Sequence, residues 1–176
     1  MSPGEWVELQ RVAYADIRTV VGGLSDSQLE QCTFPHPQGE RSIRWFCTQL
    51  LAEVAFHRWD IEYSLGTRES LDEALASYVL PFLLDSAEPL FGGLRSASDV
   101  QTFRVATSYT GWVLTVSVEG TSVAEGEGGD DVPQIHAAPG WLALAIYGRV
   151  RVDGPDFEIT GPPGTADRFA AIFGPR

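Results

Sequence analysis

Apolar residues recur at helical spacing in the first half of the chain and at every second position in parts of the second half. The longest helical pattern runs from about residue 42 to residue 65. From Asp99 the period falls from about 3.6 to 2, and Trp112, Leu114 and Val116 point to one side of a strand. Helices followed by a mixed sheet with helices on one face predict an α+β fold.

Capping signals set the limits of the predicted helices. Ser2-Pro3-Gly4-Glu5 and Ser25-Asp26-Ser27-Gln28 both have the spacing of a capping box, and so does Ser70-Leu71-Asp72-Glu73. The first helix ends at Gly22-Gly23 and the long one at Gly66. Pro81 should kink or divide the helix that follows residue 73, and Pro89 with Gly92-Gly93 should close that segment.

The remaining segments follow from turn residues and short apolar runs. Two prolines and a glycine predict a loop over residues 33–39, and acidic, glycine-rich composition predicts a mobile surface loop over 119–131. We expect a hairpin turn at residues 109–111, short strands at 132–137 and 157–159, a buried helix at 141–149 and a terminal amphipathic helix at 165–173.

Composition excludes some classes of partner. The 176 residues carry a formal net charge of −12, and all twelve basic residues are arginines, a bias typical of GC-rich bacterial genomes. An acidic chain without basic clusters is a poor ligand for nucleic acid or an anionic membrane. Cys32 and Cys47 form no metal motif, and we see neither a signal peptide nor an apolar run of membrane-spanning length. A cytoplasmic protein is expected.

The candidate chemistry lies in the long helix. At about 100° per residue, Glu53, His57 and Asp60 share one narrow sector. An apolar stripe flanks each side of it: one contains Ile43, Cys47, Val54 and Ile61, and the other contains Trp45, Ala52, Phe56, Trp59 and Tyr63. Two acids and an imidazole are therefore expected inside the molecule, where they need partners.

Two interpretations of this sector compete. In the first, Glu53 and His57 form an i,i+4 pair that braces a neighbouring element. In the second, the pair offers a carboxylate oxygen and an imidazole nitrogen to one metal ion, and Asp60 orients His57. The spacing E-x-x-x-H alone does not decide between them.

The flanking residues add a family resemblance. The stretch from Leu51 to Gly66, LAEVAFHRWDIEYSLG, resembles the signature of the mycothiol-dependent maleylpyruvate isomerase family, which belongs to the DinB-like metal-dependent thiol transferases. The segment LALAIYGR, residues 142–149, and then FEITG, residues 157–161, are similar to that family's C-terminal domain, which resembles sterol-carrier-protein (SCP2) folds. The resemblance implies a partial DinB-like helical hairpin over residues 1–66 and an SCP2-like α+β domain over 67–176.

The resemblance also implies a site. The family holds a divalent metal, usually zinc, in a four-helix bundle, and its E-x-x-x-H ligands correspond to Glu53 and His57. An arginine of the C-terminal domain lies near that site, and Arg149 is the candidate here, to bind a substrate carboxylate. The implied chemistry is addition or transfer of mycothiol at an electrophilic carbon of a small substrate. An isomerase or thiol transferase is therefore favoured.

The chain departs from the family pattern at its N-terminus. It begins where the family's third helix would begin, so the first two bundle helices and their ligand histidine are expected to be missing. Only His36 and His136 remain, and neither is a convincing third ligand. We therefore expect a homodimer in which two helical hairpins rebuild a four-helix bundle. The alternative is a metal-free protein that binds a small molecule or acts as a tailoring cyclase or isomerase.

Overall fold

The fold is taken from a computed structural model that describes residues 2–37, 39–86, 100–118, 120–129 and 131–174. These residues belong to two compact units, Met1–Thr48 and Gln49–Arg176. Helix α3, Ile43–Ser64, begins in the first unit and continues into the second. Compact units need not coincide with inherited domains, so the division of the chain at residue 66 stays a prediction.

The first unit contains two capped helices and a hairpin ahead of the beginning of α3. It contains α1 (Pro3–Gly22), α2 (Asp26–Gln31), β1 (Thr33–His36) and β2 (Gly39–Ser42). Both predicted capping boxes are present: the side chain of Ser2 accepts from the backbone of Glu5, and that of Ser25 accepts from the backbone of Gln28. The sequence therefore determined where both helices begin.

The predicted loop over residues 33–39 is wrong in part. Residues 33–36 form β1, which pairs antiparallel with β2 so that Pro35 lies opposite Glu40. Proline has no backbone N–H to donate, but an edge strand of a two-stranded ribbon has one side free of partners and tolerates it. The two prolines and the glycine therefore wrongly predicted the absence of a strand over residues 33–36.

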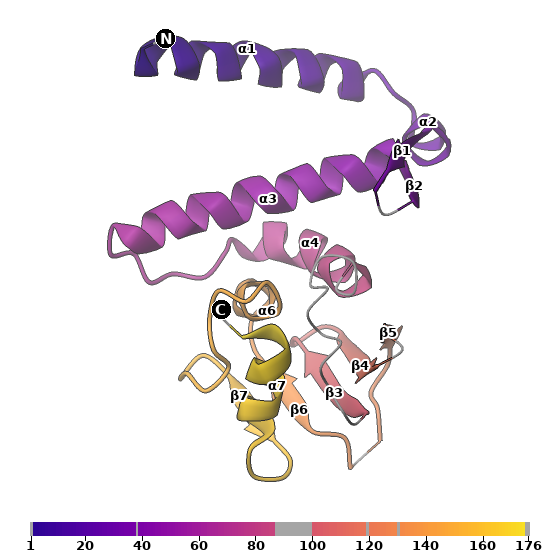
Figure 1. The fold of residues 1–176 in the computed structure, drawn as a ribbon, viewed down its shortest axis with the longest axis vertical. Helices are drawn as coiled ribbons and strands as arrows, with labels where there is room; N and C mark the ends of the chain where they lie inside the picture. Colours follow the sequence, from indigo (N-terminus) through magenta and orange to yellow (C-terminus); the bar gives the residue numbers. More distant parts are fainter. Residues whose placement is uncertain (1, 38, 87–99, 119, 130, 175–176) are drawn as a thin grey trace. The chain divides into compact units, whose positions relative to one another are not determined.

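The second unit combines the remainder of α3 with a five-stranded sheet and, among the described residues, three further helices (Figure 1). Its strands are β3 (Gln101–Ala106), β4 (Gly111–Ser117), β5 (Gly120–Glu125), β6 (Gln134–His136) and β7 (Glu158–Thr160). Its helices are α4 (Glu73–Asp85), α6 (Pro139–Ile146) and α7 (Thr165–Phe173). The strand order is β5-β4-β3-β6-β7, and only the β3–β6 pair is parallel.

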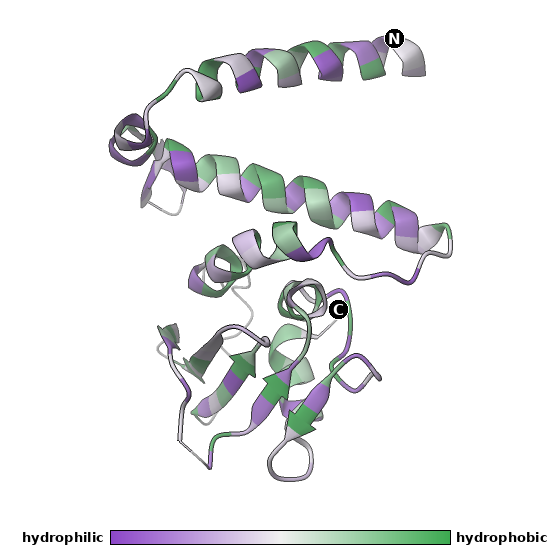
Figure 2. Ribbon diagram, turned by 180° about the vertical axis from the view of Figure 1, so that it is seen from behind, coloured by the Kyte–Doolittle hydropathy of each residue, from purple (hydrophilic) through white to green (hydrophobic). Residues whose placement is uncertain are grey.

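One face of this sheet forms the core. Phe103, Leu114 and Ile135 are completely buried on it, in one cluster with α4, α6 and α7. Helix α6 is hydrophobic nearly throughout, and seven of its eight residues are buried (Figure 2). The α+β class, with helices first and a mixed sheet after them, is confirmed. No helix in the described ranges is long and apolar enough to cross a membrane.

Two further expectations are wrong in part, and a third falls on residues that the structure does not describe. Helix α4 is capped by Asp72, whose side chain accepts from the Leu75 N–H at 2.9 Å, and not by Ser70; Pro81 lies inside it without dividing it. Residues 120–125 form strand β5 instead of a loop, because β4 supplies a continuous set of backbone partners. The predicted stops at Pro89 and Gly92-Gly93 lie outside the described residues.

Candidate functional site

The three polar residues of α3 form a short chain of contacts along the helix. The Nε2 atom of His57 lies 3.4 Å from an oxygen of Glu53, and its Nδ1 atom lies 3.4 Å from an oxygen of Asp60. The spacings i,i+4 and i,i+3 bring these side chains onto one face, as the sequence predicted. The imidazole therefore lies between two carboxylates.

The end of α6 brings two further side chains to this face. Gly148 has a left-handed φ of +71° and lies just after the last helical residues. Its N–H donates to the Ala145 carbonyl at 3.0 Å, and the Arg149 N–H donates to the Leu144 carbonyl at 2.8 Å. This pair of bonds is a Schellman motif, which reverses the chain at a helix end. The sharp turn leaves Tyr147 and Arg149 both directed at α3.

Both side chains bind the carboxylates of α3 directly. The Tyr147 hydroxyl donates to Glu53 Oε1 at 2.8 Å. The Arg149 guanidinium binds Asp60 side-on, with Nε 2.8 Å from Oδ1 and Nη2 2.9 Å from Oδ2. Charge-assisted, bidentate pairs of this kind are among the stronger polar contacts in proteins. All four predicted site residues, Glu53, His57, Asp60 and Arg149, are thus brought together.

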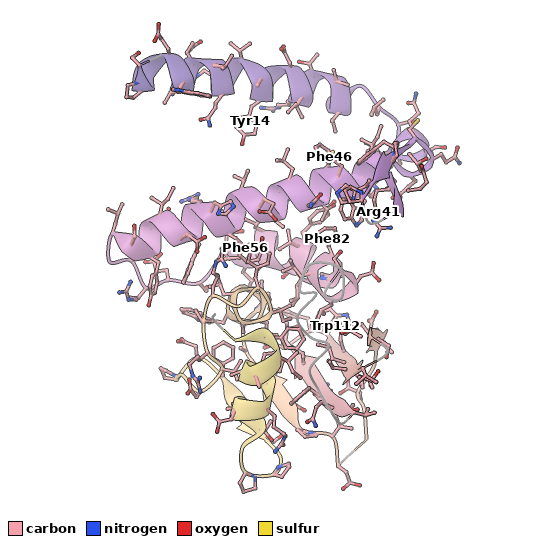
Figure 3. All side chains as sticks on the ribbon, in the orientation of Figure 1. Tyr14, Arg41, Phe46, Phe56, Phe82 and Trp112 are labelled. Atoms are coloured by element: carbon pink, nitrogen blue, oxygen red, sulfur yellow. The ribbon has the colours of Figure 1, made fainter. Side chains whose placement is uncertain are left out.

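Aromatic packing supports the same arrangement. The Phe56 ring points from α3 toward α6 (Figure 3) and stacks on the Tyr147 ring with centroids 3.9 Å apart and planes within 2°. The guanidinium carbon of Arg149 lies 4.9 Å from the centre of the Tyr147 ring. Tyr147 is the member of the site that sequence reasoning missed. The signal available was its position two residues before Arg149 at a helix end.

The expectation that the whole sector is buried is wrong for His57. Its side chain is 66% exposed, whereas those of Glu53 and Asp60 are 36% and 35% exposed. The reason is that the two flanking stripes are buried to different extents. Phe56 and its neighbours pack into the core, but Val54 is 43% exposed and Ile61 is 63% exposed on the other side of the sector.

The environment of Tyr147 changes its acidity. Burial, then the hydrogen bond donated to Glu53 and the negative charge of that carboxylate, raises the pKa of Tyr147 to about 12, against the opposing charge of Arg149. The phenol therefore keeps its proton, and its hydrogen bond to Glu53, throughout the neutral and mildly alkaline range.

We expect this hydrogen bond to make stability depend on pH in alkaline solution. An unfolded tyrosine ionises near pH 10, whereas the folded protein holds the proton until about pH 12, so the free energy of unfolding falls across that interval. Because Tyr147 is only half-buried, the loss attributable to it is about 1 kcal/mol. Urea unfolding at pH 9 to 12 should therefore show a shallower fall for Tyr147→Phe than for wild type. The exposed Tyr109→Phe variant is the control, and an equal slope in all three proteins would contradict the assignment.

The residues present do not fit a catalytic zinc within one chain. A catalytic zinc takes three protein ligands and keeps a fourth position open. In the described ranges no group of three His, Cys, Asp or Glu residues is arranged to hold a metal ion. His136 lies in β6 with its Nδ1 atom 3.8 Å from Glu158, and His36 belongs to the other compact unit. Glu53 and His57 are thus two ligands at most, and Tyr147 already binds the carboxylate of the first.

A separate hollow of about 260 Å³ lies where α4 meets one end of the sheet. Leu80, Pro81 and Trp112 give it an apolar surface, and Thr107, Thr110 and Glu125 add polar groups at its edge. Figure 3 shows Trp112 on the sheet below α4. Concave sites with mostly apolar linings and a few polar groups are the usual form of small-molecule sites.

Comparisons with known proteins do not assign this chain to a family. No family model and no curated protein matches the chain. Among the solved structures that match is one described as a "UbiJ-SCP2 Ubiquinone synthesis protein", 18% identical to this chain, covering 52% of this chain and 88% of its own, with a TM-score of 0.39. A likeness of this strength carries no argument about function. The resemblance to maleylpyruvate isomerases therefore stays a prediction.

Proposed function

We propose that this is a cytoplasmic small-molecule-binding protein that resembles maleylpyruvate isomerases but does not use a metal. Where the resemblance implies a metal site, the carboxylates of Glu53 and Asp60 bind Tyr147 and Arg149 instead. The observation that carries the proposal is the way the two carboxylates are used. Tyr147 donates to Glu53, and Arg149 occupies both oxygens of Asp60, so each acid has a partner in its own chain. Partly buried carboxylates with such partners have no need of a metal to offset their desolvation.

The small molecule would occupy the hollow beside Trp112. The indole and Leu80 would contact an apolar ring, and the carboxylate of Glu125 would accept from a hydroxyl or amine of the ligand. The ligand class that fits is a small ring-bearing molecule with a hydrogen-bond donor. A tailoring reaction, such as a cyclisation or isomerisation, is compatible with a ligand held in this way.

Metal content and ligand binding test this proposal together. Protein purified without chelator should contain far less than one zinc per chain by plasma mass spectrometry. His57→Ala should change the free energy of unfolding by no more than about 0.5 kcal/mol, because the side chain is mostly exposed. In ¹⁹F NMR, the signal of 4-fluorophenol should broaden with the wild type and not with Trp112→Ala.

The matched control for the 4-fluorophenol measurement is Trp6→Ala, which removes an indole that is 54% exposed on α1. That variant should bind 4-fluorophenol as the wild type does. Equal broadening with Trp112→Ala and wild type would overturn the proposed pocket. One zinc per chain that is lost in His57→Ala would overturn metal independence.

A metal-dependent isomerase or mycothiol transferase is the second candidate function. It is favoured by the exposure of His57 beside Glu53, which leaves the imidazole accessible to a second chain. A partner in a homodimer could then add the third ligand, and zinc or another divalent ion would activate the thiol of mycothiol. Arg149 would have to exchange Asp60 for a substrate carboxylate.

The homodimer itself rests on exposed apolar helix surface. Helix α1 buries none of its residues, and Trp6, Ile17 and Val20 are 54%, 41% and 67% exposed. On α3, Val54 and Ile61 are exposed as well. Exposed large apolar side chains of this number along single helices favour a protein partner. Two copies related by a two-fold axis would cover it and form a four-helix bundle.

We expect light scattering after size exclusion to return twice the chain mass. Ile17→Asp should yield the monomer, because it places a charge in the apolar face of α1. Thr19→Asp, on the polar face of the same helix, is the control and should stay dimeric. A monomeric wild type would contradict the dimer, and would indicate that α1 is covered within its own chain.

A further inference from the structure

The face of the sheet opposite the core carries an arginine in an unusual setting. Arg104 is the central residue of β3 on that face, between Val113 of β4 and Gln134 of β6. Its side chain is only 14% exposed. Because a guanidinium keeps its charge under all ordinary conditions, a buried one must find acceptors.

A glycine makes room for this guanidinium. A Cβ atom built at Gly111 would lie 2.8 Å from Nη2 and 3.2 Å from Nε of Arg104. The guanidinium therefore lies directly against the backbone of β4, at a place where any side chain would displace it. On its other side, Nη1 donates to the Gln134 amide oxygen at 2.6 Å. Its position is thus determined by rigid elements of the sheet.

On the edge of the guanidinium that faces away from Gln134, only one of the two N–H donors has an acceptor in the described part of the chain. Nη2 pairs with the carboxylate of Glu127, whereas Nε is buried and has no acceptor among the described residues. Nε and Nη2 are the two donors that bind a carboxylate side-on, and Arg149 uses this same pair to hold both oxygens of Asp60. Arg104 therefore offers a two-donor edge to which Glu127 supplies one contact.

The group that makes this contact is weakly held. Glu127 lies in the sequence Gly126-Glu127-Gly128-Gly129, and its side chain is 86% exposed. Glycine loses more conformational freedom on ordering than any other residue, so a carboxylate carried by this segment is a poor permanent partner. A free carboxylate has no such constraint, and one that displaced Glu127 would pair with both Nε and Nη2.

We propose that Arg104 is a binding position for the carboxylate of a small molecule, and that Glu127 occupies it as a tethered competitor when that molecule is absent. The site lies on the opposite face of the sheet from the hollow beside Trp112, so it does not depend on the function proposed above. Val113 and Thr115 are the neighbouring side chains on β4 that share the face with Arg104, and they would adjoin the rest of the ligand.

Acetate is the simplest probe, because it carries the same carboxylate as Glu127 and little else. Its binding can be followed by the NMR signal of the Arg104 Nε–H, with sodium chloride as the ionic-strength control. A tethered competitor acts at an effective concentration of about a millimolar or more, so Glu127→Gln should lower the apparent Kd for acetate about tenfold. Asp131→Asn, which removes one charge from the same acidic stretch, should behave as the wild type.

Two further measurements test whether acetate binds at Arg104 and whether the site prefers a carboxylate. Arg104→Lys retains the charge but lacks the side-on edge, so acetate should no longer perturb the backbone signals of Val113 and Gln134 in that variant. If Arg104→Lys fails to fold, the acetate affinities of Glu127→Gln and Asp131→Asn still show whether Glu127 competes for the site. Equal acetate affinity in wild type and Glu127→Gln, or no acetate response in either, would overturn the proposal. Inorganic phosphate binding Glu127→Gln more tightly than acetate would overturn the assignment to a carboxylate.

Discussion

Phe56→Ala should lower the free energy of unfolding by about 3–5 kcal/mol, the largest effect that we expect from a single substitution in this protein. The Phe56 side chain is completely buried and stacks on Tyr147 at 3.9 Å. Its removal leaves a cavity between α3 and α6 and also removes the support of the ring that donates to Glu53. The loss in the free energy of unfolding therefore has two parts. One is the hydrophobic free energy of burying the ring, and the other is the van der Waals contact that the residues around the cavity lose.

The same substitution at an exposed position of α3 is the control. Phe46 is 43% exposed and makes an edge contact with Phe34 at 5.7 Å, so Phe46→Ala should cost only about 0.5–1.5 kcal/mol. Chemical denaturation of the two variants and the wild type measures the difference directly. Similar losses for Phe46→Ala and Phe56→Ala would show that α3 does not pack on α6 through Phe56.

Gly140→Ala should destabilise the protein by about 2–3 kcal/mol, although alanine is the better helix former. A Cβ at Gly140 would lie 2.4 Å from the Leu71 carbonyl oxygen and 2.9 Å from the Ser70 side chain. Backbone cannot give way as a flexible side chain can, so α6 would have to shift. That shift would carry Tyr147 and Arg149 away from the carboxylates of α3.

Two observations distinguish this displacement from a general loss of stability. Gly129→Ala adds the same methyl group where nothing lies within 4 Å, and should change stability by no more than about 0.5 kcal/mol. In Gly140→Ala, the alkaline fall in stability that we assign to Tyr147 should become smaller as its hydrogen bond to Glu53 weakens. A Gly140→Ala protein as stable as the wild type would mean that α6 does not approach residues 70–71 so closely.

Local signals in the sequence determined most of the helices and the central strands. Ser2 and Ser25 each supply a cap that binds the backbone three residues later, an interaction complete within one helical turn. Alternation placed Leu114 and Val116 on the buried face of β4 for a similar reason, since the period of a strand is a local property. The α+β class followed from the order of these elements.

Pairing between strands was not determined by such signals. The segments 33–36 and 120–125 lie within stretches that contain proline, glycine or acidic residues, and each is a strand because a neighbouring strand supplies its backbone partners. The cap of α4 was also ambiguous locally, because Ser70 and Asp72 both precede the helix and only the path of the chain selected Asp72.

For the site, the sequence alone established that Glu53, His57 and Asp60 share one face of a helix, because i,i+3 and i,i+4 spacing follows from the geometry of the helix itself. Only the tertiary structure decided which groups meet that face. It brought Tyr147 and Arg149 from about ninety residues away, through a turn at Gly148, and left His57 exposed because the stripe with Val54 and Ile61 does not pack into the core. Contacts between distant segments depend on how whole elements pack, and no local pattern of residues encodes that packing.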